Sequence, residues 1–354
     1  MKKLLEVLKI FAGWRLALLF LTIVFVPLSQ NFVALSNFDG LRFLNIAKEG
    51  YGTPHTFYSY SLFPLYPLMV KYFSGLMGYL GSGLFVSHFF ALGSLILFKK
   101  LAELDYSKQS VNRSLILFLC FPASFFLISV YSESLFLFLC LAAVYLSRKK
   151  YYLLSGIMAF LATYTRSVGI FLWILLLVEY YQENKNNLKN ILKPISLTLL
   201  IPPLGALYYF NYLQVNTSNV LNFLPTIPQK FVFLHQVILR YGKMLVFMDH
   251  LSPLFWVILT EAIVGFFALF LLVISYGKLR TSYWIYFFLS FFIPTLWGNF
   301  VGMPRFMIVV FPVFFFLGNW LERQHPYFQK FYYSVSVILL IINFSLFLNG
   351  IFVG

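Results

Sequence analysis

Long apolar runs divide this sequence, and they constrain its fold more than any other feature. Segments such as Leu115–Val130 and Phe306–Leu317 are apolar at almost every position, so they offer no polar face to water. Of the residues, 61% are hydrophobic and 10% are charged, whereas a soluble domain carries about 25% charged residues. The strands of a membrane β-barrel alternate apolar and polar positions, and these runs do not. The sequence therefore predicts an all-α, polytopic membrane protein.

Eleven segments are apolar enough to be predicted as membrane-spanning helices. They are Ile10–Leu28, Gly83–Leu101, Ser114–Val130, Ser134–Leu146, Leu153–Tyr164, Val168–Tyr180, Pro194–Leu213, Pro253–Tyr276, Tyr283–Trp297, Phe306–Trp320 and Phe331–Leu348. We expect Leu65–Leu80 to lie flat at the membrane interface. With the N-terminus cytoplasmic, 17 of the 26 Lys and Arg residues then fall inside, 8 fall outside, and Arg15 lies within the first span. This excess of positive charge inside is typical of membrane proteins.

The short basic clusters between apolar runs follow that rule, so the net charge of +15 does not indicate a nucleic-acid partner. We expect one membrane domain over residues 1–354, with membrane lipids around it. Its two long extracytoplasmic loops cover residues 29–82 and 214–252. Both loops are rich in aromatic and apolar residues, which indicates that they fold against the membrane face. The first of them is predicted to carry interfacial helices.

Four charged residues are predicted to lie at extracytoplasmic turns. They are Asp39, Glu133, Arg166 and Arg305. Asp39 either caps the short amphipathic helix that follows it or serves as a carboxylate base at the membrane boundary, where partial desolvation would raise its pKa and suit it to proton abstraction. Each arginine either extends toward lipid headgroups from a helix end or binds an anionic substrate with its fork of donors. Ionisable groups at membrane depth are more often functional, so we favour a substrate site. No metal or cofactor is predicted, because the five histidines lack ligand spacing and nucleotide-binding motifs are absent.

The residues around these charges resemble the PIG-V-like mannosyltransferases, which are GT-C glycosyltransferases related to the enzyme that adds the second mannose of the GPI anchor. The resemblance begins with FDGLRFLNIAKEGY (Phe38–Tyr51) and SLFPLYPL (Ser61–Leu68). It continues through YSESLF (Tyr131–Phe136), TRSVG (Thr165–Gly169), and MPRF followed by FP (Met303–Pro312). Phe38 stands where the family usually has Trp.

The resemblance implies a GT-C-like bundle and an inverting glycosyltransferase. It implies that a sugar, by family mannose, moves from a polyprenyl (dolichyl-type) phosphate donor to a glycan or glycolipid acceptor. The resemblance implies that Asp39 is the general base. From their charge and location we expect Arg166 and Arg305 to bind the donor phosphate, and Glu133, Arg42 and Tyr51 to contact substrate. The site would face the outside of a prokaryotic cell membrane or the lumen of the endoplasmic reticulum. The alternatives are a lipid or solute transporter, which Glu261 within a span would suit, and a non-catalytic scaffold.

Overall fold

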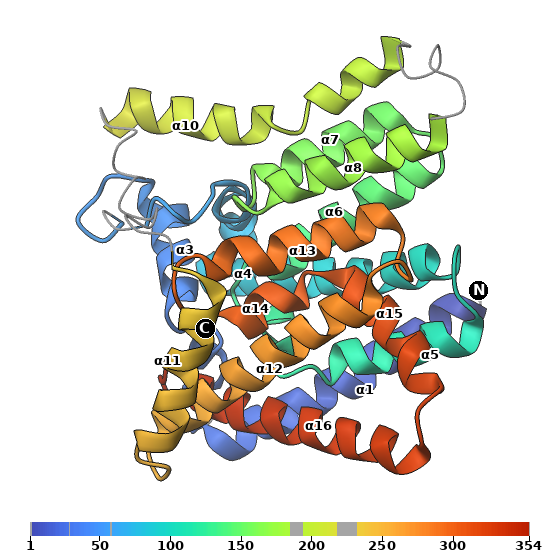
Figure 1. Cartoon of the computed structure of the whole chain (residues 1–354). Coiled ribbons are helices and arrows are strands. Elements are labelled where there is room, and N and C mark those ends of the chain that lie inside the picture. The colour runs from blue at the N-terminus through green and yellow to red at the C-terminus, as the bar shows by residue number, and fades with distance from the viewer. Residues whose placement is uncertain (1, 28, 57–58, 185–193, 218–231, 354) are drawn as a thin grey trace.

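The computed structural model describes residues 2–27, 29–56, 59–184, 194–217 and 232–353, and every regular element in these ranges is a helix (Figure 1). The α-helices are α1 (Lys2–Phe25), α2 (Asn31–Ala34), α3 (Asp39–Glu49), α4 (Leu65–Ala102), α5 (Lys108–Leu119), α6 (Glu133–Arg148), α7 (Tyr152–Thr163), α8 (Gly169–Asn184), α10 (Leu204–Thr217), α11 (Leu234–Phe247), α12 (Pro253–Ser275), α13 (Thr281–Thr295), α14 (Met303–Ile308), α15 (Phe311–Glu322) and α16 (Pro326–Leu348). Two 3₁₀ helices, η1 (Ser124–Leu127) and η2 (Pro194–Leu200), complete the set. The predicted all-α class is confirmed for this part of the chain.

Four of these helices are long and apolar enough to cross a membrane, namely α1 over Leu4–Phe25, α4, α12 and α16. The other described helices have 16 residues or fewer, and a hydrocarbon core requires about 20. Helical segments occupy each of the eleven predicted spans, but eleven crossings are not confirmed. The chain is a helical membrane protein.

Proline splits three of the predicted spans. The first, Ser114–Val130, consists of the end of α5 and the separate η1. Pro122 follows α5 by three residues, and a proline cannot continue the hydrogen-bond ladder of a helix. In Pro194–Leu213, Pro202 and Pro203 separate η2 from α10. In Phe306–Trp320, α14 ends before α15 begins with Pro312 in its first turn.

The segment Leu65–Leu80 is helical but continues into the following span, so α4 runs over both. The two parts meet at a kink, where Met77 and Gly78 leave the helical backbone region. Gly78 has φ 68°, a conformation that costs glycine little. The kink changes the direction of the helix between the two parts. The position of Leu65–Leu80 at the membrane interface stays a prediction.

Ion pairs gather at the end of the bundle where the N-terminus lies. Arg148 of α6 binds Asp105 through two hydrogen bonds of 2.8 and 2.9 Å. Arg280, before α13, binds Glu179 of α8 at 3.0 and 2.9 Å. Lys99 of α4 also binds Glu6 of α1 at 2.5 Å. These contacts join four helices and the segments before α5 and α13 at one end.

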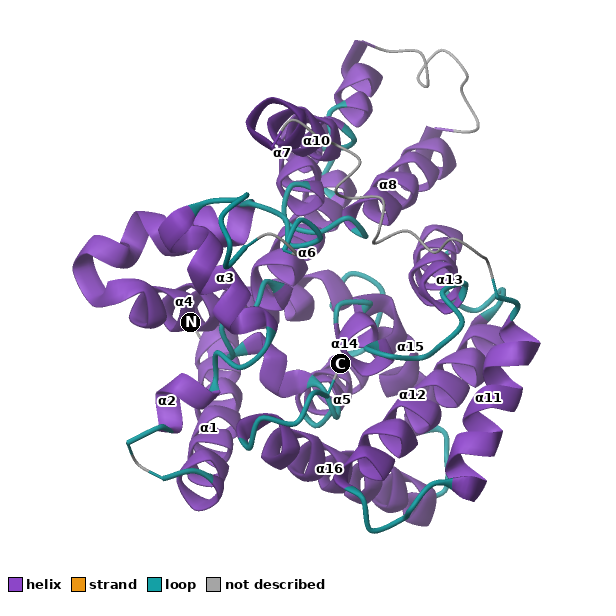
Figure 2. Ribbon diagram, turned by 90° about the vertical axis from the view of Figure 1, so that its left-hand side faces the viewer, coloured by secondary structure: helices purple, strands orange, loops and turns teal. Residues whose placement is uncertain are grey.

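The opposite end carries α3, α11 and the C-terminus (Figure 1). Figure 2 turns this end toward the viewer, with the C-terminus near the centre, α3 on one side and α11 on the other. Of the second predicted loop, residues 214–252, the part at 218–231 lies outside the described residues, and the remainder contributes the end of α10 and all of α11. This end of the bundle holds the charged residues singled out from the sequence.

Candidate functional site

Asp39 is the first residue of α3, as its position before an amphipathic segment predicted. It does not serve as the N-cap, because Phe38 takes that position and no side chain caps the helix. Phe38 has φ 57°, which is uncommon for a residue other than glycine. Two contacts hold this turn: the Asn37 side chain donates to the Phe347 carbonyl at 2.8 Å, and the Phe38 ring packs on Phe352 at 5.3 Å. These two contacts hold Phe38 in this strained conformation at the start of α3.

Gly40 allows α3 to approach the segment that precedes α6. A Cβ atom at Gly40 would lie 3.2 Å from the Val130 carbonyl oxygen, which is tighter than most Cβ contacts. The Val130 N–H in turn donates to the Leu35 carbonyl at 2.9 Å. The Asp-Gly pair therefore brings the carboxylate of Asp39 close to the turn that carries Glu133.

The four predicted charges form one connected network. Arg305 donates from Nη1 to Asp39 Oδ2 at 2.6 Å, and from Nε to Glu133 Oε1. Arg166 donates from Nη1 to the same Glu133 oxygen. Arg42 reaches the other oxygen of Asp39 at 3.3 Å. Four separate parts of the chain thus converge on two carboxylates.

Glu133 is the centre of this network and is fully buried, with a side-chain exposure of 0%. It is the first residue of α6, where the helix dipole stabilises a negative charge. The Arg305 guanidinium also lies 4.6 Å from the ring centre of Tyr131, close enough for a cation–π contact. Glu133 and Tyr131 therefore fix the orientation of Arg305.

Burial and the neighbouring arginines act in opposite directions on the pKa of Asp39. Burial would raise the pKa of its carboxyl, but the positive charge and hydrogen bond of Arg305 outweigh burial, with a smaller contribution from Arg42. The net result is a pKa below the ordinary value of an aspartic acid. The expected rise in the pKa of Asp39 from desolvation at the membrane boundary is therefore wrong, because the arginines stabilise the charged form more than burial disfavours it. The neighbouring guanidinium groups favour the carboxylate form and make it a weaker base than a free aspartate.

Asp39, Arg166 and Arg305 line a cavity of about 300 Å³. Its wall also includes Ser61, Leu62, Phe63, Ser132, Thr165, Trp297, Val301 and Gly302. Among the described residues, no hydrogen-bond partner engages Nη2 of Arg305 or Nε and Nη2 of Arg166. The cavity thus offers unused guanidinium donors beside a charged carboxylate.

Arg42 and Tyr51, which were also predicted to contact substrate, do not line this cavity. Arg42 is at the rim, with 54% of its side chain exposed. Tyr51 belongs to a separate aromatic cluster, where its hydroxyl donates to the Leu62 carbonyl at 2.5 Å and its ring lies 5.6 Å from Tyr209. Tyr51 lines a different, smaller cavity of about 130 Å³. Tyr51 does not line the larger cavity. It contacts that cavity's lining only through its hydrogen bond to Leu62.

The structure adds residues that the sequence reasoning did not select. Ser132 and Thr165 adjoin Glu133 and Arg166, so their presence in the same motifs was an available signal. Trp297 and Gly302 come from the loop between α13 and α14, which showed no recognisable pattern. Gly302 has φ 73° at the start of α14, a backbone conformation that favours glycine.

Comparison with known proteins identifies the family to which this helical membrane bundle belongs. Residues 15–322 match the mannosyltransferase (PIG-V) family. The chain therefore belongs to this family of glycosyltransferases, and its membership implies a sugar donor and a glycan acceptor. No curated protein and no solved structure matches the chain at the threshold applied.

Proposed function

We propose that this protein transfers mannose, with inversion, from a polyprenyl phosphate donor to a hydroxyl group of a glycan or glycolipid. One observation carries the proposal: Asp39 and Arg305 meet at 2.6 Å on the wall of a cavity that Arg166 also lines. A base and a phosphate-binding group are the two functions that direct displacement at a sugar phosphate requires. The sequence motifs place Asp39 and Arg305 far apart along the chain. The hydrogen bond between them shows that the two side chains are in contact in the folded protein.

The donor phosphate would bind the unused donors of Arg166 and Arg305. The network holds the three guanidinium groups of Arg42, Arg166 and Arg305 and two carboxylates, which leaves one positive charge. A sugar phosphodiester carries one negative charge, so its binding would neutralise the site. Arginine forks bind phosphate oxygens with two hydrogen bonds, and they would stabilise the charge that develops on the leaving phosphate.

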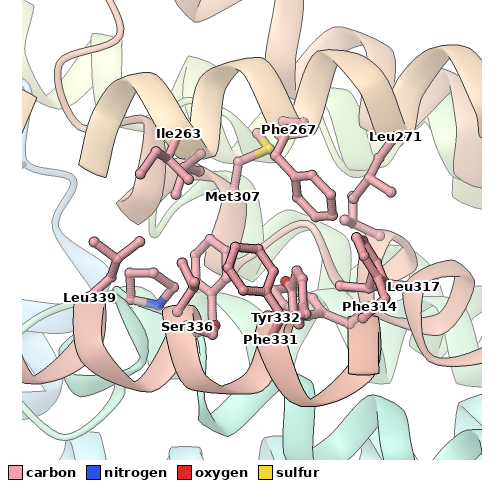
Figure 3. Close-up of a pocket in the computed structure, with 17 residues that line it drawn as sticks. Ile263, Phe267, Leu271, Met307, Phe314, Leu317, Phe331, Tyr332, Ser336 and Leu339 are labelled. Carbon is pink, nitrogen blue, oxygen red and sulfur yellow. The ribbon is translucent and has the colours of Figure 1, made fainter. Parts of the chain in front are cut away.

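The hydrocarbon part of such a donor needs an apolar surface nearby. A second cavity, of about 260 Å³, lies between α12, α15 and α16 (Figure 3). Ile263, Phe267 and Leu271 line it from α12, and Tyr332 and Leu339 line it from α16. Met307 of α14 also points into it. Phe306 lines the charged cavity, so two consecutive residues of α14 line the two cavities. The charged cavity would hold the phosphate of the donor and the apolar cavity its hydrocarbon chain.

Asp39 would accept the proton of the acceptor hydroxyl as its oxygen attacks the anomeric carbon. The new bond forms while the bond from that carbon to the phosphate oxygen breaks, and the polyprenyl phosphate leaves with the electron pair. Because attack and departure occur on opposite faces, the configuration at the anomeric carbon inverts. Glu133, which lies behind the arginines and does not line the cavity, would position them without touching substrate.

The transfer itself is the direct test. Purified protein in lipid nanodiscs should move radiolabelled mannose from polyprenyl phosphate mannose to an acceptor panel of glycans and glycolipids. GDP-mannose serves as the control donor, and we expect no transfer from it because the site offers no nucleotide-binding motif. Transfer from GDP-mannose alone would contradict the proposal.

We expect the site to face the outside of the membrane, since the predicted topology leaves 17 of the 26 Lys and Arg residues on the cytoplasmic side. Single cysteines at Lys48, exposed on α3, and Lys149, exposed after α6, report on the two ends. In a background without Cys120 and Cys140, a membrane-impermeant maleimide added to intact cells should label position 48 and leave position 149 unlabelled. The reverse pattern would invert the proposed orientation.

A further inference from the structure

Glu261 is a buried carboxyl group in the middle of α12, and the proposed reaction does not use it. Only 4% of this residue is exposed. Its Oε2 accepts a hydrogen bond of 2.6 Å from the Tyr241 hydroxyl, and its Oε1 accepts one of 3.1 Å from the Gly302 N–H. No ion pair to Glu261 occurs among the described residues. A carboxyl group held by two protein donors in this way is suited to joining segments of the chain.

Tyr241 also binds a second residue in the loop between α13 and α14, the loop to which Gly302 belongs. Its hydroxyl donates to Glu261 and accepts the N–H of Phe300 at 3.1 Å. Both Tyr241 and Phe300 are fully buried, with ring centres 5.0 Å apart. The loop between α13 and α14 is therefore held at two backbone N–H groups by one tyrosine–glutamate pair.

Two more contacts tie α11 and the segment before it to this loop. Arg240 Nη1 donates to the Gly298 carbonyl at 2.6 Å, and the Val232 N–H donates to the Leu296 carbonyl at 3.0 Å. Figure 2 shows α11 beside α12 at the end of the bundle that carries the charged cavity. Residues of both α11 and α12 therefore form hydrogen bonds with this loop.

The same loop forms part of the charged cavity. Trp297, Val301 and Gly302 line that cavity, and Arg305 follows Gly302 by three residues in α14. Gly302 is the N-cap of α14, so the hydrogen bond from its N–H to Glu261 fixes where this helix begins. A shift of that N–H would move the guanidinium of Arg305 relative to Asp39 and Glu133.

We propose that Glu261 and Tyr241 are positioning residues, which hold the loop Leu296–Gly302 and so set the place of Arg305 for donor binding. The proposal rests on the proposed function for its kinetic consequence. Removing the pair leaves the N–H groups of Phe300 and Gly302 buried without partners, which costs free energy. The loop would relieve that cost by moving toward solvent. Misplacement of a catalytic site by about 1 Å lowers rates by about a hundredfold.

The kinetic test compares Tyr241→Phe, Glu261→Leu and Glu261→Gln with the unaltered protein. We expect kcat/KM for the donor to fall by about ten- to a hundredfold in the first two, while KM for the acceptor stays unchanged. Glu261→Gln should retain most activity, because its amide oxygen still accepts the Gly302 N–H and its NH₂ can donate to Tyr241. Unchanged donor kinetics in Tyr241→Phe and Glu261→Leu would overturn the proposal.

Thr260→Val is the matched control. Thr260 is the preceding residue of α12 and accepts a buried hydrogen bond of 2.9 Å from Asn343 of α16, away from the loop. This variant should lose stability without losing donor kcat/KM. An equal kinetic loss in Thr260→Val would mean that any lost hydrogen bond in α12 has this effect, and it would overturn a positioning role.

A labelling measurement tests the loop without using the reaction. Met303 is 1% exposed at the start of α14, so a cysteine there reacts with a maleimide only when the loop opens. In protein without the native cysteines, Met303→Cys should react at least several-fold faster when combined with Tyr241→Phe than alone. Equal rates would overturn the proposal. If the unaltered protein transferred no sugar, the proposed function would fail while this comparison still decided the role of the pair.

Discussion

Asp39→Asn should lose turnover by about 10²–10⁴-fold, the usual contribution of a general base. Asparagine has the same shape as aspartate, and its carbonyl oxygen can still accept the hydrogen bond from Arg305, which is 2.6 Å in length with aspartate. It cannot accept the proton of the acceptor hydroxyl. We therefore expect kcat to fall, with donor affinity close to that of the unaltered protein. Initial rates of mannose transfer and equilibrium binding of the donor measure the two effects separately.

Glu49→Gln provides the control for this variant. Glu49 ends the same helix and binds Thr53 and His55 outside the charged cavity. Its replacement removes one carboxylate from α3, as Asp39→Asn does, and should leave turnover unchanged. If Asp39→Asn turned over at the rate of the Glu49→Gln variant, Asp39 would not be the base.

Arg305→Ala is expected to weaken donor binding by about 1.5–3 kcal/mol, the value of a hydrogen bond to a charged group. It should also destabilise the fold by about 3–5 kcal/mol, because Glu133 and Asp39 lose a buried cationic partner. The side chain of Glu133 is fully buried, so water cannot replace Arg305 as the partner of its carboxylate. Donor affinity by titration and thermal unfolding in detergent would measure the two losses.

Arg280→Ala separates these two effects. Arg280 binds the buried Glu179 through two hydrogen bonds at the opposite end of the bundle. Its loss should destabilise the fold in a similar way and leave donor affinity intact. If both variants weakened donor binding equally, the effect would come from general instability, and Arg305 would not contact the phosphate.

The sequence predicted the charged residues of the site better than it predicted the helices around them. Asp39, Glu133, Arg166 and Arg305 stood out because charge is scarce in apolar sequence and each lay at a turn on the same predicted side. Their mutual contacts follow once those turns meet at one end. Their catalytic and binding roles stay predictions.

The interruptions of the helices were harder to predict. Apolar composition continues through Pro122 and Pro312, so a reading by hydropathy joined segments that the backbone separates. The hydrogen bond between Tyr241 and Glu261 could not be predicted from the sequence either. In the sequence, Glu261 within a span suited a transporter. Its two donors become visible only where α11 and the segment before α14 pack against α12. Contacts between distant segments leave no periodic signal in a single sequence.

The configuration of the product tests the central claim most directly. The mannose transferred from polyprenyl phosphate mannose can be examined by NMR at its anomeric carbon. Direct displacement with Asp39 as base predicts a product whose anomeric configuration is opposite to that of the donor. Retention of the donor configuration would require a covalent intermediate or a second displacement, and it would contradict the mechanism proposed for this site.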